Sequence, residues 1–150
     1  MPSNQTPLGA LPSRFRRQRV LIVGCGDVGL RVLKVQRHVR FVALTSDAKR
    51  VPELRAAGAT PVLGNLDQPH TLKRLAALAH RVIHLAPPPL QGQTDPRTLA
   101  LCRVLLQRTA VQSVVYASTS GVYGDCAGEW VHENRALNPT TPRAQRRVHA

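Results

Sequence analysis

Short apolar runs alternate along the chain with amphipathic segments, beginning at Val20. Val20 to Val23 is an unbroken apolar run that passes into glycines, which predicts a buried parallel strand. The next segment has apolar residues at helical spacing and predicts a helix whose inner side carries Val28, Val32, Leu33 and Val35. The same reasoning predicts strands at 40–45, 61–63, 81–86 and 113–118, and helices at 48–57, 71–79, from Thr94 or Asp95 to about Arg108, and from about Pro142.

Strands that alternate with helices of this length indicate a parallel sheet with right-handed crossovers. The sequence therefore predicts an α/β fold: a Rossmann-type, doubly wound parallel sheet with strand order 3-2-1-4-5. That order places the glycine-rich turn outside the carboxyl ends of the strands, where such sheets bind ligands. We expect one dinucleotide-binding domain over 19–150 that is truncated, with its substrate domain absent, and a disordered basic tail over 1–18.

The turn after the first strand reads Gly24-Cys25-Gly26-Asp27-Val28-Gly29 and has GxGxxG spacing. Gly24 permits a tight turn, Gly26 lets the backbone approach a diphosphate, and Gly29 lets the following helix pack on the strand. The diphosphate would lie against the N–H groups at the positive end of that helix. All six residues are predicted to bind the cofactor. The alternative is a turn that serves only the fold.

The end of the second strand is where the adenosine ribose should bind. Thr45 lies 21 residues after Gly24, close to the position at which an acidic residue usually contacts the ribose 2'-hydroxyl. Thr45 and Ser46 carry no charge that would repel a 2'-phosphate, and Lys49 and Arg50 follow closely. This pattern favours NADP. Asp47 as a ribose ligand would favour NAD instead.

Composition narrows the possible partners. The formal charge is +13, from 21 Lys and Arg against 8 Asp and Glu, but the cations are spread from Arg14 to Arg147 with no interleaved aromatic residues. We therefore do not expect a nucleic-acid partner. No apolar run is long enough to span a membrane, and the first 18 residues lack the apolar core of a signal peptide. Three cysteines without metal-ligand spacing predict reduced thiols in a cytoplasmic protein.

Three further motifs follow the glycine turn in order: Gly-Asn-Leu-Asp at 64–67, Val-Ile-His-Leu-Ala at 82–86, and the segment 114–125 with Ser118-Thr119-Ser120. With them the chain resembles the amino-terminal half of the extended short-chain dehydrogenase/reductase family, most closely its atypical, NAD-dependent epimerase/dehydratase-like branch. The resemblance implies an oxidoreductase or a sugar-nucleotide epimerase or dehydratase acting on an unknown small molecule. It adds Asn65, beside the adenine, and Leu66 and Ala86 to the predicted cofactor-binding residues.

The resemblance also bears on catalysis. Thr119 matches the hydroxyl residue that polarises the substrate oxygen in the family. The family's Tyr-x-x-x-Lys acid/base pair falls on Arg143 and Arg147, and an arginine cannot cycle a proton. Thr119 could instead bond only to neighbouring backbone. The alternatives to an enzyme are a non-catalytic NAD(P)-binding module or redox sensor, and a truncated product without independent activity.

Overall fold

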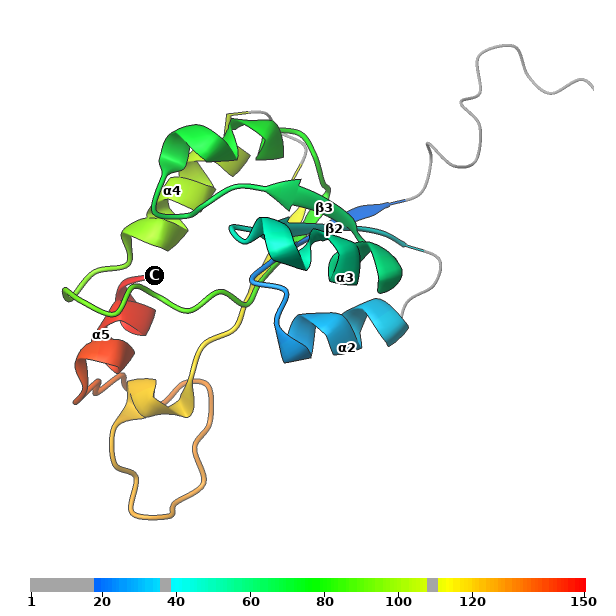
Figure 1. Cartoon of the computed structure of the whole chain (residues 1–150). Coiled ribbons are helices and arrows are strands. Elements are labelled where there is room, and N and C mark those ends of the chain that lie inside the picture. The colour runs from blue at the N-terminus through cyan, green and yellow to red at the C-terminus, as the bar shows by residue number, and fades with distance from the viewer. Residues whose placement is uncertain (1–17, 36–38, 108–110) are drawn as a thin grey trace, which may run out of the picture.

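The computed structural model describes residues 18–35, 39–107 and 111–150. Its centre is one parallel sheet of five strands in the order β3-β2-β1-β4-β5 (Figure 1). The strands are β1 (Arg19–Val23), β2 (Arg40–Thr45), β3 (Thr60–Leu63), β4 (Arg81–His84) and β5 (Ser113–Tyr116). The α/β fold and the strand order predicted from the sequence are both confirmed.

Helical segments cover both faces of the sheet. One face carries α2 (Asp27–Val35) and α3 (Val51–Ala56), and the other carries η2 (Pro69–Leu75) and α4 (Pro96–Leu105) (Figure 1). The alternate residues of β1 separate the two cores accordingly. Leu21 and Val23 pack toward η2 and α4, whereas Val20 and Ile22 pack toward α2 and α3. Such two-sided burial explains why the inner strands read as continuous apolar runs.

The inner side of α2 differs from the prediction. Val28 is 60% exposed and Val35 is 79% exposed, while Gly29 and Leu33 are the buried residues of the helix. Val28 and Val35 are seven residues apart and share a helical face, but that face is turned outward. Gly29 must approach the strand closely, so its face, one residue along, is the one that packs on the sheet.

Several boundaries also differ from the prediction. The segment expected as a helix over 71–79 is a 3-10 helix, η2, which ends at Leu75 before Ala77 adopts a φ of 59°. The helix expected over 48–57 is divided into η1 (Ala48–Arg50) and α3. The fourth and fifth strands end two residues early, at His84 and Tyr116. Except for Gln18, the predicted basic tail lies outside the described residues.

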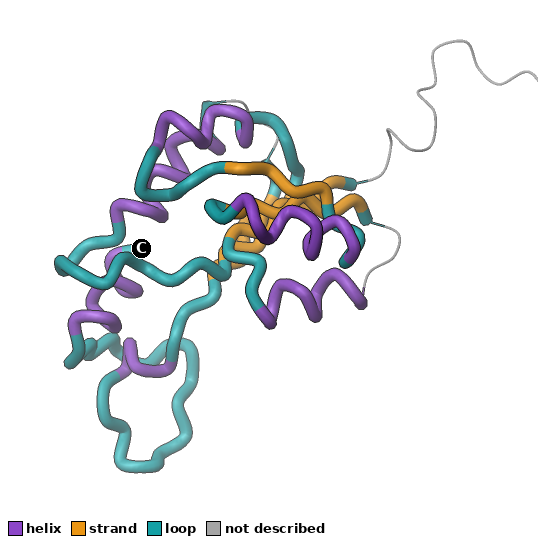
Figure 2. Tube along the Cα trace, viewed as in Figure 1, coloured by secondary structure: helices purple, strands orange, loops and turns teal. Residues whose placement is uncertain are grey.

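The chain after β5 leaves the sheet. η3 (Ser120–Tyr123) leads into a long loop that projects away from the sheet (Figure 2). Val131 and Leu137 on this loop are exposed. The loop returns to α5 (Pro142–His149), where the Thr141 hydroxyl accepts a hydrogen bond from Ala144 N–H. The helix expected from Pro142 is therefore present.

Three contacts hold α5 against distant parts of the chain. Arg146 Nη1 donates to the Gly92 carbonyl at 2.6 Å, and Arg147 Nη1 donates to the Ala117 carbonyl at 2.7 Å. The backbone N–H of Asp95 donates to His149 Nδ1 at 3.2 Å. Arg146 and Arg147 are both buried. α5 therefore fixes the loop that follows β4 as well as the end of β5.

Candidate functional site

The three glycines of the turn after β1 occupy different environments. Gly24 has a φ of 82°, and a Cβ there would lie 2.5 Å from Ala86 N. A Cβ on Gly29 would lie 3.0 Å from Cys25 Sγ, because α2 packs closely on β1 at this point. Both positions need glycine for reasons internal to the fold.

No contact within the fold requires a glycine at position 26. Gly26 is exposed, its φ is not positive, and a Cβ built there would meet no atom within 4 Å. Its carbonyl accepts from Leu30 N–H at 2.9 Å, so it directly precedes the first turn of α2. The first backbone N–H groups of a helix have no partner within it. Gly26 thus keeps open a space beside the positive end of α2.

That space is part of a cleft of about 500 Å³ at the carboxyl ends of the strands. The glycine turn forms one wall, the ends of β2 and β3 form another, and the start of α4 contributes a third. The lining residues are Val23, Gly24, Cys25, Gly26, Leu44, Thr45, Ser46, Asp47, Arg50, Gly64, Asn65, Leu66, Asp67, Leu85, Ala86, Pro87 and Arg97.

Most of the residues predicted to bind the cofactor meet in this one cleft. They are Gly24, Cys25, Gly26, Thr45, Ser46, Asn65, Leu66 and Ala86. Asp27, Val28 and Gly29 begin α2 and are not among the lining residues. Cys25 is 2% exposed, and burial raises the pKa of its thiol, so it is a packed side chain rather than a reactive thiolate.

The end of β2, where the sequence predicts that the ribose binds, forms a local turn. The Thr45 hydroxyl donates to the Asp47 carbonyl and accepts from Asp47 N–H, both at 3.2 Å, so it closes a local turn. Asp47 in turn caps η1 by accepting from Lys49 N–H at 2.9 Å. Ser46 is exposed in the cleft. Of the two cations that follow Ser46 in the sequence, Arg50 lines the cleft and Lys49 does not.

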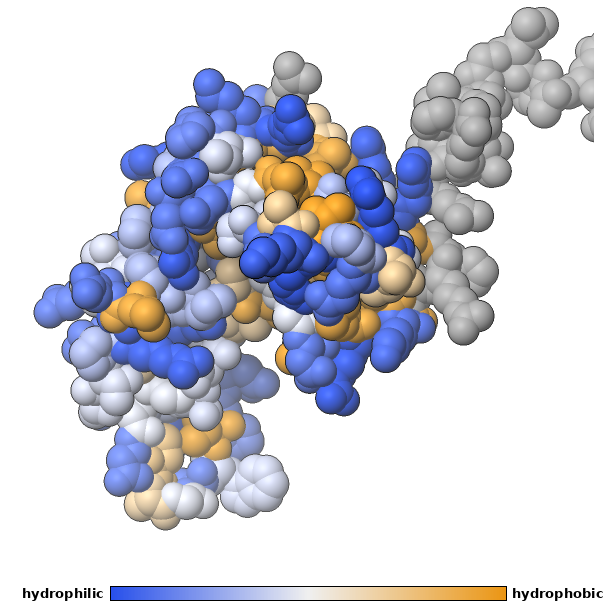
Figure 3. Space-filling model, in the orientation of Figure 1, coloured by the Kyte–Doolittle hydropathy of each residue, from blue (hydrophilic) through white to orange (hydrophobic). Residues whose placement is uncertain are grey.

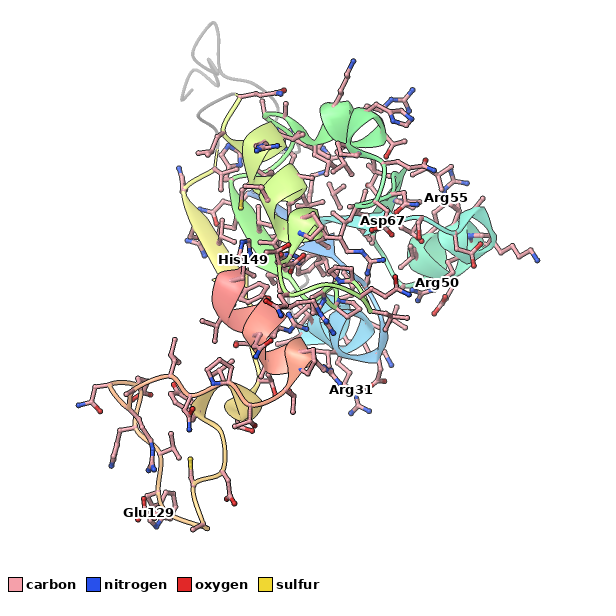
Figure 4. The ribbon with its side chains drawn as sticks, turned by 90° about the vertical axis from the view of Figure 1, so that its left-hand side faces the viewer. Arg31, Arg50, Arg55, Asp67, Glu129 and His149 are labelled. Carbon is pink, nitrogen blue, oxygen red and sulfur yellow. The ribbon has the colours of Figure 1, made fainter. Side chains whose placement is uncertain are left out.

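Arg50 is held in place by an ion pair with Glu53. Its Nε and Nη2 donate to the two carboxylate oxygens at 3.0 and 3.2 Å. This hydrogen bonding raises the pKa of Arg50 further. These two hydrogen bonds to Glu53 orient the Arg50 guanidinium at the cleft. In the view of Figure 4, Arg50 and Asp67 lie on the same side of the molecule.

A second ion pair spans the cleft and was not found from the sequence. Arg97, at the start of α4, donates to both oxygens of Asp67 at 2.7 and 2.6 Å, and its Nη1 donates to the Pro87 carbonyl at 3.3 Å. This hydrogen bonding lowers the pKa of Asp67. The pair joins segments 30 residues apart, so no local pattern could have indicated it.

The described residues that the family resemblance links to catalysis, Thr119, Arg143 and Arg147, do not line the cleft. The Thr119 hydroxyl accepts from Gly121 N–H at the start of η3, and Thr119 is absent from the described residues that line the cleft. Arg143 is exposed on α5. Arg147 is buried, with its guanidinium carbon 5.2 Å from the centre of the Tyr116 ring.

Behind the cleft, a buried polar chain joins β4 to α4. His84 Nε2 lies 2.9 Å from the Thr98 hydroxyl, which donates to Asp95 Oδ2 at 2.8 Å. Because that hydroxyl already donates, His84 must donate from Nε2. Asp95 also accepts from Thr98 N–H at 3.1 Å and so caps α4. This network fixes the start of α4, which carries Arg97.

A comparison with family models identifies the family of this chain. The TrkA-N domain model matches residues 20–125, which include the glycine turn, the cleft and all five strands from Val20 onward. The chain belongs to the TrkA-N domain family. It is therefore an NAD(P)-binding Rossmann domain. No curated protein matches this TrkA-N domain chain in sequence.

Several solved structures with the same fold are described as epimerases. A conserved protein of unknown function from Silicibacter pomeroyi DSS is 26% identical, with a TM-score of 0.69 over 89% of this chain and 46% of its own. A UDP-galactose 4-epimerase is 19% identical, with a TM-score of 0.73 over 87% and 48%. The UDP-glucose 4-epimerase of Thermus thermophilus, solved with NAD, is 22% identical, with a TM-score of 0.68 over 87% and 48%.

These likenesses show the fold, and the chain spans about half the length of the structures that it matches. None of the described helices is long and apolar enough to cross a lipid bilayer. The described histidines, cysteines and carboxylates form no group of three or more that could hold a metal ion.

Proposed function

We propose that this chain binds NADP or NAD in the cleft, with the diphosphate beside Gly26. Gly26 is the observation that carries the proposal. The fold explains Gly24 and Gly29, whereas a side chain on Gly26 would meet nothing in the protein. A glycine that the fold does not require, at the positive end of a helix and inside a cleft, suits the close approach of a phosphate.

We further propose that NADP binds more tightly than NAD, and that Arg50 is responsible. Thr45 uses its hydroxyl in a local turn, which leaves Ser46 and Arg50 as the groups that could hold a 2'-phosphate. Arg50 is already oriented by Glu53 and keeps its charge at any ordinary pH. Asp47 supports the NAD alternative, because it also lines the cleft.

The diphosphate site is tested by Gly26→Val. This variant should fold with an unchanged melting temperature, because the added side chain points into open space, and should bind NADPH at least about tenfold more weakly, a loss of ~1.4 kcal/mol. Fluorescence titration with NADPH and calorimetry measure the two effects. Gly24→Ala is the matched control: it should lower the melting temperature. Unchanged NADPH affinity in Gly26→Val would show that the turn serves only the fold.

The cofactor preference is tested by Arg50→Gln, with Lys49→Gln as the control of equal charge change. Loss of a charged hydrogen bond to the 2'-phosphate should weaken NADPH binding about tenfold, with less than a twofold effect on NADH. Lys49→Gln should change neither affinity, because Lys49 is not among the lining residues. If Asp47→Asn weakens NADH binding and Arg50→Gln has no effect on NADPH, the NAD alternative holds.

We also propose that the chain is related to the extended short-chain dehydrogenases/reductases and works in the cytoplasm as a cofactor-binding module without proton transfer. The support is the position of the two arginines. Arg143 is exposed and always protonated, and Arg147 is committed to the Ala117 carbonyl and the Tyr116 ring. The second candidate is an oxidoreductase or sugar-nucleotide epimerase in which Thr119 orients the substrate. Turnover of UDP-sugars with added NAD or NADP, followed by product chromatography, would favour this second candidate.

A further inference from the structure

The carboxylates of this protein are confined to one side of the sheet. All eight Asp and Glu of the sequence fall within the described residues. Each follows the carboxyl end of a strand, either at the start of the next helix or in the loop that leads to it. They are Asp27, Asp47, Glu53, Asp67, Asp95, Asp125, Glu129 and Glu133.

The opposite side of the sheet, where the strands begin, is basic. β1, β2 and β4 are adjacent, and each starts with an arginine: Arg19, Arg40 and Arg81. Arg19 is in register with Arg40, and Arg81 with Val20. The helical segments end at this side, and their last turns add cations. We call the whole set the basic edge: Arg19, Lys34, Arg40, Arg55, Lys73, Arg74, Arg81 and Arg103.

Helix dipoles explain only part of this arrangement. Cations in a last turn are stabilised by the negative end of the helix, which accounts for Lys34, Arg55 and Arg103. The three arginines that begin strands have no such explanation.

The basic edge continues into a groove between η2 and α4. This groove has a volume of about 290 Å³ and is lined by Pro69, His70, Lys73, Ala100, Arg103, Val104 and Gln107. No carboxylate lines it. Lys73 and Arg103 therefore face the same space from two elements without an acidic group between them. Hydrophilic residues cover much of the surface over η2 and α4 (Figure 3).

We propose that the basic edge binds the phosphate backbone of nucleic acid, on the side of the sheet opposite the dinucleotide cleft. The cations look scattered in the sequence, but the topology gathers them where the strands begin. Arg19 and Arg40 are in register on one face of the sheet and Arg81 lies on the other, so the edge presents charges on both faces of three adjacent strands, which suits a polyanion better than a single phosphate.

The chemistry of the basic edge predicts contact with backbone phosphates and not with bases. Phe41 is buried, and Tyr116, Tyr123 and Trp130 lie in or after β5, away from the basic edge. The described residues therefore offer no Phe, Tyr or Trp ring there on which an unpaired base could stack. Binding should be independent of sequence, at least as strong for duplex as for single-stranded DNA, and steeply dependent on salt.

The test is fluorescence anisotropy of random-sequence duplex DNA with the full chain over a range of salt concentrations. The edge variant is Arg19→Gln, Arg40→Gln and Arg81→Gln together. Three lost phosphate contacts, at about 0.9 each, should reduce the slope of log K against log salt by roughly 2.7, with binding more than about tenfold weaker at low salt. Arg31→Gln, Lys49→Gln and Arg135→Gln together remove the same charge elsewhere and should weaken binding much less.

Other results would overturn the proposal. One is that the two triple variants weaken DNA binding equally. Another is that the wild type does not bind duplex DNA at low salt. The third is that the wild type binds phosphatidylserine vesicles more tightly than DNA. If the edge variant does not fold, as judged by circular dichroism, the pair Lys73→Gln and Arg103→Gln replaces it, with an expected reduction in slope of roughly 1.8. NADPH binding should be unchanged in every edge variant, which separates this proposal from the cofactor site.

Discussion

His84 is a histidine enclosed in the core, only 2% exposed. Burial lowers its pKa from 6.5 to about 4, and the positive charge of Arg147 adds to this effect while the Asp95 carboxylate opposes it. The Tyr116 ring lies 5.3 Å away at an angle of 63° and contributes no charge. The folded protein therefore keeps this imidazole neutral, donating from Nε2 to Thr98.

Stability should consequently fall as the pH drops from 6.5 to 4. In this range the unfolded chain binds a proton at His84 and the folded chain does not, so protonation favours unfolding. The full effect of one such group is ~3 kcal/mol, and it is absent above pH 6.5. Urea unfolding at several pH values measures it. His84→Gln, although less stable overall, should lose this part of the pH dependence; an unchanged slope would assign it to other groups.

At the scale of elements, α5 is the segment whose role departs most from the family resemblance. Its two arginines at the positions of the family's Tyr and Lys have opposite surroundings. Arg143 is exposed, and Arg147 is 8% exposed, bonded to the Ala117 carbonyl and stacked near Tyr116. Arg147 thus joins the helix to the end of β5.

Arg147→Ala should destabilise the fold by ~2–4 kcal/mol, because it removes a charged hydrogen bond and a ring contact from a buried site. Arg143→Ala should change the free energy of unfolding by less than about 0.5 kcal/mol, as is usual for an exposed residue. Chemical denaturation of the two variants gives the comparison. Equal effects would mean that the Arg147 contacts contribute little to stability.

At the scale of the whole molecule, NADPH should stabilise every element that lines the cleft. These residues come from β1, β2, η1 and α4, from the glycine turn, and from the segments that follow β2, β3 and β4. At a free NADPH concentration of 100 times its dissociation constant, the gain is about 2.7 kcal/mol. The expected result is a rise in melting temperature with NADPH that is about halved in Gly26→Val, because tenfold weaker binding leaves about 1.4 kcal/mol of the gain. An undiminished rise in Gly26→Val would place the NADPH elsewhere.

The overall fold could be predicted from the sequence because hydrophobic runs and glycines are local signals. Each strand of the sheet was found, and eight residues of the predicted cofactor site line one cleft. The pair Asp67 and Arg97 could not be found, since it depends on how η2 and α4 pack. The exposure of Val28 could not be predicted for a related reason. The periodicity of the sequence defines the faces of a helix, but the packing of the helix decides which face is buried.

The contacts of α5 also set an order on the formation of this domain during synthesis. Arg146 and Arg147 bond to residues 54 and 30 positions earlier in the chain. A chain growing on the ribosome can pair its five strands as soon as β5 has emerged, and domains generally begin to fold from the amino terminus. The loop around Gly92 and the end of β5 must then wait for α5. The glycine turn and β2 are complete much earlier, so NADPH could meet its binding residues before the loop that follows β4 is fixed.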